Sequence, residues 1–246
     1  MSWYEITALG MIAGVVGTGT GGLFSIFIKK PTPRFTGTIL AFAAGIMLSI
    51  VFLELIFESI EQSGTGAALA GLSGGMLIFY LLDHYLPHHH TITEEKTHLG
   101  SYLKKGTLLA LGIALHNFPE GLAIGSGFVG STEIGLALVF LIGLHNIPEG
   151  MAVAAPLSQA GYSYGKVIAI AALSGAPMGI GALAGALIGG ISVFILALSL
   201  GFAAGAMLYI VCDELIPDAY ESAGAHLSIL GIFTGTFLGI LFTEWF

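Results

Sequence analysis

The chain has 246 residues, of which 55% are apolar and only 9% charged, whereas soluble domains carry roughly 25% charged residues. This composition excludes an ordinary soluble domain and indicates a membrane protein. The formal net charge of −8 argues against a nucleic-acid partner, and the single cysteine, Cys212, excludes a disulfide framework.

Apolar segments separated at charges, Pro and Gly predict an all-α membrane protein with eight transmembrane helices, since about 20 apolar residues span a bilayer. In chain order, the predicted helices cover residues 5–28, 36–60, 65–86, 101–126, 131–157, 164–187, 190–215 and 225–246. We expect them to form a single transmembrane domain over residues 1–246. A His-rich loop is expected at residues 84–100, between the third and fourth helices.

The basic residues predict the orientation of the chain in the membrane. All seven fall in connections on one side: Lys29, Lys30, Arg34, Lys96, Lys104, Lys105 and Lys166. By the positive-inside rule this side is cytoplasmic, so both termini of a multi-pass protein of the cell (inner) membrane are expected outside. Acidic residues expected on the outer side would attract cations or simply cap loops: Glu58, Glu61, Glu133, Asp218 and Glu221.

Two segments of the chain resemble each other. Residues 42–56 read FAAGIMLSIVFLELI, and residues 202–216 read FAAGAMLYIVCDELI. We therefore expect the first three and the last three helices to be copies around a central pair, in a 3+2+3 arrangement. Because three is odd, the second copy is inverted, an architecture that transporters use around a site at mid-membrane.

The central pair of predicted helices carries a second repeat, HNFPEG at residues 116–121 and HNIPEG at residues 145–150. A His and a Glu four residues apart share one helix face, and imidazole with carboxylate suits zinc and its first-row neighbours. Asn117 and Asn146 each lie three residues before the Glu, which permits a carboxylate shared between two metals without requiring it.

The turn between these helices is centred near residues 130–131, so His116 and His145 are expected at the same depth. Glu120 would then lie on the outward side of the two imidazoles and Glu149 on the inward side, in a column of ligands. The proline in each motif is expected to kink its helix and free a backbone carbonyl.

An alternative interpretation is that these polar residues only hold helices together. Ionised carboxylates are costly in hydrocarbon, however, and intramembrane ionisable groups are functional by default. The predicted metal ligands are His116, Asn117, Glu120, His145, Asn146 and Glu149.

These motifs resemble the ZIP (Zrt-, Irt-like protein) family of zinc and other divalent metal transporters, in its short prokaryotic form, over essentially the whole chain. The resemblance implies that the six residues form the transport site and that Met47 adds a thioether ligand. Asp213 and Glu214 match a place where relatives often carry a His-Glu pair. Ala176 stands where many relatives carry a Glu, so a single well-held metal is favoured, with a weaker second position at the two asparagines.

The loop at residues 84–100 contains His88, His89 and His90. His-rich tracts bind transition metals, and the resembled family often has such a loop. We expect a role in gathering metal or in regulation, with an inert solvated loop as the alternative.

Transport of divalent metal ions, with zinc import into the cytoplasm, is the predicted function. A broad-specificity iron, manganese or cadmium transporter and a passive channel remain alternatives, because the same ligands serve Fe²⁺, Mn²⁺, Cd²⁺ and Co²⁺. An intramembrane metalloenzyme is a remote alternative, since zinc hydrolases use His-Glu-x-x-His and the residue after His116 is Asn117. We thus expect no enzyme and no cofactor; the expected partners are the transported ions, the lipid bilayer and, as the resemblance implies, a second copy in a homodimer.

Overall fold

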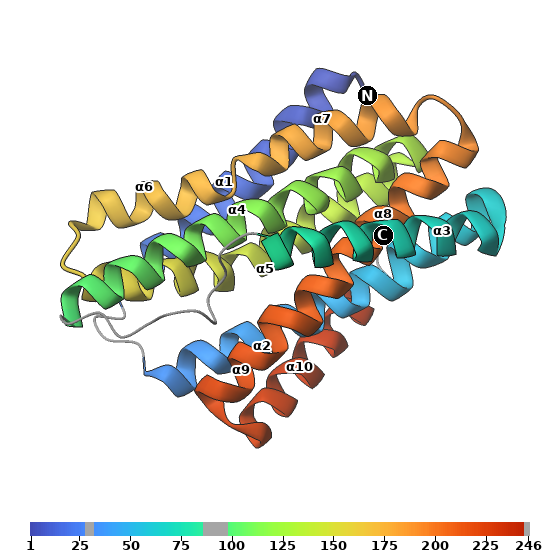
Figure 1. Cartoon of the computed structure of the whole chain (residues 1–246). Helices are drawn as coiled ribbons and strands as arrows, with labels where there is room; N and C mark the ends of the chain where they lie inside the picture. Colours follow the sequence, from blue (N-terminus) through green and yellow to red (C-terminus); the bar gives the residue numbers. More distant parts are fainter. Residues whose placement is uncertain (28–31, 86–97, 244–246) are drawn as a thin grey trace.

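The computed structural model of the protein describes residues 1–27, 32–85 and 98–243, which are helical apart from short turns (Figure 1). The α-helices are α1 (Trp3–Phe27), α2 (Pro33–Ser49), α3 (Ile56–Tyr85), α4 (His98–Gly130), α5 (Thr132–Gln159), α6 (Tyr164–Ser174), α7 (Pro177–Gly189), α8 (Val193–Ile210), α9 (Ile216–Ala223) and α10 (Ala225–Thr243). Two π-helical segments, η1 (Ile50–Leu55) and η3 (Val211–Leu215), join α2 to α3 and α8 to α9. The all-α prediction is confirmed for the described residues.

Residues with special hydrogen-bonding or backbone properties explain where several helices begin and end. Ser131 Oγ accepts a hydrogen bond from the Ile134 backbone N–H at 3.1 Å and so starts α5 directly after α4. Ser192 caps α8 in the same way through Ile195, at 3.2 Å. Gly224 ends α9 with a φ of 78°, a conformation that residues with a side chain rarely adopt.

Six helical segments within the described residues are long and apolar enough to cross a membrane. They are Trp3–Phe24, Pro33–Leu82, Thr132–Gln159, Tyr164–Gly189, Val193–Ala223 and Ala225–Phe242. The segment Pro33–Leu82 has 50 residues and is interrupted at Ser63 and Gly64, whose backbone angles are not helical. The chain is therefore a multi-pass helical membrane protein.

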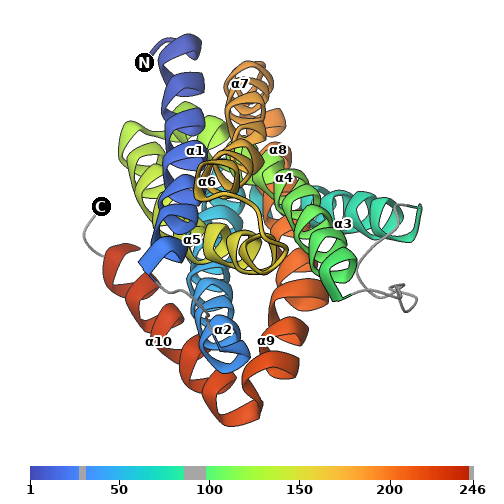
Figure 2. The same ribbon diagram turned by 90° about the vertical axis from the view of Figure 1, so that its left-hand side faces the viewer.

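The helices lie in two groups (Figures 1 and 2). One group contains α1, α4, α5, α6 and α7, and the other contains α2, α3, α8, α9 and α10. Glycines permit the closest contacts within each group: a side chain on Gly121 of α4 would collide with the Met178 carbonyl of α7. Likewise, a side chain on Gly75 of α3 would collide with the Phe202 carbonyl of α8. Small residues let helix backbones approach closely in lipid, where packing replaces the hydrophobic effect as the force between helices.

The two π-helical segments occupy equivalent places in the two sequence repeats. Each ends on a Glu-Leu pair, at residues 54–55 and at residues 214–215. Segments of this kind are rare and often occur at functional sites. Their equivalence supports the internal repeat between residues 42–56 and residues 202–216.

The structure contradicts the expected placement of Asp218 and Glu221. A Cβ on Gly37 would lie 2.9 Å from the Ala219 carbonyl, so this acidic segment lies at the end of the molecule where α2 begins, the end of Arg34. The expectation was wrong because Val193–Ala223 runs the length of the molecule and returns the chain to that end. Figure 1 shows α9 beside the start of α2.

The acidic group at the opposite end is smaller than expected. Glu58 lies there, because a Cβ on Gly130 would be 3.2 Å from its Oε1 atom, and Gly130 directly precedes the α4–α5 turn. Glu133 lies in the first turn of α5, at the same end.

Prolines inside the predicted helices have different effects on the helices of the structure. Pro119 and Pro148 lie inside α4 and α5, and each helix continues on both sides of its proline. Neighbouring groups in a helix bundle can satisfy the backbone atoms that an internal proline leaves unpaired. The predicted helix 164–187 is instead divided into α6 and α7, and Pro177 is the first residue of α7, where its missing N–H costs nothing.

Candidate metal centre

The six predicted ligands all lie on α4 and α5, which run side by side and are joined only by Ser131. All six are buried: His116 is 3% exposed and the other five are 0% exposed. The sequence thus places polar and acidic groups in the interior of an apolar bundle, and each of them needs a partner there.

Three of these side chains converge on one point between the helices. His145 Nε2 lies 3.0 Å from Glu120 Oε1 and 3.9 Å from Glu149 Oε1. One ligand atom from each residue can be chosen so that all three lie within 4.8 Å of one another. Imidazole nitrogen and two carboxylate oxygens are a donor set that Zn²⁺ binds in tetrahedral sites, with a fourth position left for another ligand.

The electrostatics of this cluster favour a cation. Glu120 Oε2 and both carboxylate oxygens of Glu149 are buried without a hydrogen-bond partner among the described residues. Two fully buried carboxylates beside a single imidazole are strongly unfavourable, because unpaired buried charge is expensive. A divalent cation among the three side chains would neutralise both carboxylates and coordinate their free oxygens.

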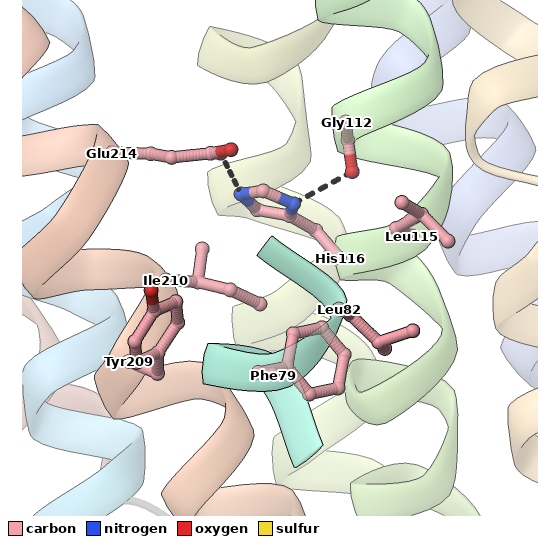
Figure 3. Close-up of a pocket in the computed structure, with 8 residues that line it drawn as sticks. All are labelled: Phe79, Leu82, Gly112, Leu115, His116, Tyr209, Ile210 and Glu214. Atoms are coloured by element: carbon pink, nitrogen blue, oxygen red, sulfur yellow. Dashed lines mark hydrogen bonds and ion pairs between the residues drawn. The ribbon is translucent and has the colours of Figure 1, made fainter. Parts of the chain in front are cut away.

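His116 is not one of these three side chains and has other partners. Its Nδ1 lies 2.6 Å from the Gly112 carbonyl, and its Nε2 lies 2.7 Å from Glu214 Oε2 of η3 (Figure 3). A carbonyl only accepts hydrogen bonds, so Nδ1 donates to it and Nε2 is the nitrogen directed at the carboxylate. The side-chain partner of His116 is therefore Glu214 of η3. The sequence had suggested Glu214 only as an ancillary ligand.

A small pocket opens beside this pair. Figure 3 shows its lining residues: Phe79, Leu82, Gly112, Leu115, His116, Tyr209, Ile210 and Glu214. The imidazole and the carboxylate are the metal-ligating side chains among these lining residues, and aromatic and aliphatic side chains form most of the remaining wall. The pair thus lies next to a cavity between α3, α4 and the end of α8.

The two asparagines meet each other next to a methionine. Asn146 Nδ2 donates to Asn117 Oδ1 at 3.3 Å and lies 4.0 Å from Met178 Sδ. Asn117 donates its own Nδ2 to the Ile113 carbonyl at 2.8 Å. Met178 was not predicted from the sequence, because a methionine in an apolar segment is typical of a helix core and carries no signal of its own.

The structure gives less information about the other ancillary ligands that the sequence suggested. Met47 is fully buried in the apolar core on α2, and Asp213 is half-buried in η3. His88, His89 and His90 lie outside the described residues. Within 84–100, α3 extends to Tyr85 and α4 begins at His98.

An apolar helical bundle with a buried carboxylate–imidazole cluster defines a polytopic membrane protein with a candidate cation site. Residues 87–243 match the family model described as ZIP Zinc transporter. The chain is 37% identical to the zinc transporter ZupT of Corynebacterium glutamicum, over 92% of this chain and 93% of that protein. It is 32% identical to the ZupT of Stenotrophomonas maltophilia, over 91% and 89% of the two chains. It is 33% identical to the zinc transporter ZTP29 of Arabidopsis thaliana, over 94% and 91%.

The chain belongs to the ZIP zinc transporter family. The family resemblance noted in the sequence is confirmed, and the metalloenzyme alternative is set aside because this is a family of transporters.

Proposed function

We propose that the protein carries divalent metal ions, with zinc as the main cargo, through the centre formed by Glu120, His145 and Glu149. The observation that supports this most directly is the convergence of three buried ligand groups, in which Glu120 Oε2 and both oxygens of Glu149 have no hydrogen-bond partner in the part of the chain that the structure describes. Membership of the ZIP zinc transporter family and zinc transporters at 32–37% identity point to the same cargo. Fe²⁺, Mn²⁺, Cd²⁺ and Co²⁺ remain alternative ions, because imidazole and carboxylate serve them as well.

The site has features of a transport site more than of a permanent structural one. Structural zinc sites in proteins are closed by four protein ligands, and this cluster supplies three. His116 of α4 and Glu214 of η3 offer a further imidazole and carboxylate beside a pocket, so an ion that leaves the cluster would have a second pair of ligands. The asparagine pair, as a weaker second metal position, remains part of the proposal.

Removing the imidazole at the centre tests the proposed function. His145→Ala is expected to reduce zinc uptake into proteoliposomes by at least about 100-fold, since even groups that only orient metal ligands are worth 10–100-fold. The measurement is the initial rate of fluorescence change of an enclosed zinc-sensitive dye. His226→Ala, which removes an exposed imidazole from α10, is the matched control and should transport like the unmodified protein. Unreduced uptake by His145→Ala would refute the central site.

We further propose eight membrane crossings in the inverted 3+2+3 arrangement. The 50-residue segment Pro33–Leu82 would cross twice, turning at Ser63 and Gly64, and α4 would cross antiparallel to α5. The positive-inside rule supports a cytoplasmic start of α2 in the inner membrane, with both termini outside. The homodimer and the role of the His-rich loop stay predictions.

Cysteine labelling from one side of the membrane tests this orientation. In a Cys212→Ser background, Glu61→Cys should react with a membrane-impermeant maleimide added to intact cells, because it lies at the Glu58 end. Glu221→Cys should react only after the membrane is permeabilised, because it lies at the Arg34 end. Both positions are exposed, so their accessibility to the reagent is matched. Labelling of Glu221→Cys alone in intact cells would reverse the orientation.

A further inference from the structure

We propose that Met178 is a specificity-determining residue of the transport site, whose thioether sulfur favours soft divalent ions such as Cd²⁺ and Zn²⁺ over hard ions such as Mn²⁺. This proposal rests on the proposed transport function and adds a selectivity element to it. Met178 is the second residue of α7 and is 0% exposed. Its sulfur faces the polar centre of the bundle, where it lies near the amide of Asn146.

The contacts of Asn146 mark a position where a cation would fit. Its Nδ2 group, a donor, lies 3.3 Å from Asn117 Oδ1 and 4.0 Å from Met178 Sδ. An oxygen and a sulfur with lone pairs therefore converge on one donor group. A cation in the place of that donor would meet the same two atoms.

Asn146 itself can supply a third ligand atom. Its Oδ1 is buried without a hydrogen-bond partner among the described residues, which is costly for an amide oxygen. The terminal torsion of an asparagine side chain is soft and roughly two-fold. Rotation about it exchanges Nδ2 for Oδ1, so that the free oxygen joins Asn117 Oδ1 and Met178 Sδ around a bound ion.

The carboxylate of the main cluster is available to complete this set. Glu149 follows Asn146 by three residues on α5, and residues with this spacing are neighbours on a helix surface. Both of its oxygens lack hydrogen-bond partners among the described residues. One oxygen can therefore serve the His145 position while the other serves the amide position.

The proposed selectivity follows from ligand chemistry. Oxygen ligands alone suit hard ions such as Mg²⁺, Ca²⁺ and Mn²⁺, whereas thioether sulfur prefers softer metals. Ala176 offers no carboxylate at the break between α6 and α7, so the sulfur of Met178 is the heteroatom that α7 brings to Asn146. Replacing it by carbon should reduce the preference for soft ions without removing the central ligands.

The test compares Cd²⁺, Zn²⁺ and Mn²⁺ uptake by proteoliposomes that contain Met178→Leu, a change that keeps the side-chain volume nearly constant. We expect the ratio of Cd²⁺ to Mn²⁺ uptake to fall about 10-fold, within the range seen when groups around a metal site are changed. Zn²⁺ uptake should continue at a measurable rate. Met207→Leu is the matched control, since Met207 is a methionine of equal burial on α8, and its uptake ratio should not change.

The outcomes separate this proposal from the proposed function. An unchanged Cd²⁺ to Mn²⁺ ratio in a transporting Met178→Leu protein would overturn the role of Met178 and leave zinc transport intact. An equal fall in Met207→Leu would also overturn it, because the effect would not depend on the position. Absence of metal uptake by the unmodified protein would instead refute the proposed function.

A spectroscopic measurement covers the case in which Met178→Leu does not fold. In selenomethionine-labelled protein loaded with Cd²⁺, X-ray absorption at the selenium edge should show a cadmium neighbour. That signal should persist in Met47→Leu, which removes the other candidate methionine. No cadmium neighbour in the unmodified protein, or its loss in Met47→Leu, would overturn the proposal.

Discussion

Replacing Glu149 by Gln is expected to reduce zinc uptake by at least about 100-fold while leaving the protein folded, since groups that merely orient metal ligands are worth 10–100-fold. Glutamine keeps the size of the side chain but removes the charge that a cation would neutralise. Neither carboxylate oxygen of Glu149 has a hydrogen-bond partner among the described residues, and its contact with His145 Nε2 is long at 3.9 Å, so the change breaks no hydrogen bond and only this weak ion pair. The metal-free variant should therefore be as stable as the unmodified protein, or more so.

Two measurements on the Glu149→Gln variant distinguish a lost ligand from a lost fold. Zinc should raise the melting temperature of the unmodified protein, because a ligand that binds only the folded state stabilises it, and this rise should disappear in the variant. Glu133→Gln, at an exposed position in the first turn of α5, should keep both zinc uptake and the thermal shift. Normal uptake by Glu149→Gln would show that this carboxylate does not hold the ion.

The second large effect is expected from the glycines between α3 and α8. Gly75→Ala should lower the stability of the protein by about 1–3 kcal/mol or more, the usual cost of overpacking. Its new Cβ would collide with the Phe202 carbonyl and lie 2.8 Å from the Ala206 nitrogen, so a helix backbone would have to move. The measurement is the melting temperature of the detergent-solubilised protein.

The neighbouring glycine is a matched control for Gly75→Ala. A Cβ on Gly74 would have Phe202 Cδ2 at 3.9 Å as its nearest neighbour, which is an ordinary contact. Gly74→Ala should therefore be neutral or stabilise the helix by up to about 1 kcal/mol, the difference in helix propensity between the two residues. Equal melting temperatures for the two variants would mean that α3 and α8 are not in close backbone contact.

The sequence was most informative where the physics is local. The spacing of His and Glu on one helix face depends only on helix geometry, and the six residues it selected are all buried side by side on α4 and α5. The repeat between residues 42–56 and residues 202–216 could be read directly, and the structure adds equivalent π-helical segments within it.

Contacts between helices could not be predicted in the same way. The rotation of each helix about its axis is set by packing, so spacing could not tell that His145 would meet Glu120 while His116 would meet Glu214. Met178 could not be predicted either, because a methionine in an apolar segment is indistinguishable from an ordinary core residue in the sequence. Only the distance to Asn146 distinguishes it.

The proline and charge patterns predicted that a helix would be interrupted and that acidic residues would gather at an end of the bundle, but they did not predict where. The prolines of the two motifs were singled out from the sequence, but the proline at which one helix ends and another begins is Pro177, the first residue of α7. Asp218 and Glu221 lie at the Arg34 end of the molecule and not at the expected Glu58 end, because the segment Val193–Ala223 returns the chain to that end.

The π-helical segment η3 limits which changes of sequence length this protein can tolerate. Such a segment accommodates an extra residue within an otherwise α-helical rod, and each residue of an α-helix turns the chain by about 100°. Loss of a single residue there would rotate one half of the rod against the other. Glu214 would then swing away from His116 with every side chain chemically intact, so this ion pair depends on segment length as much as on residue type.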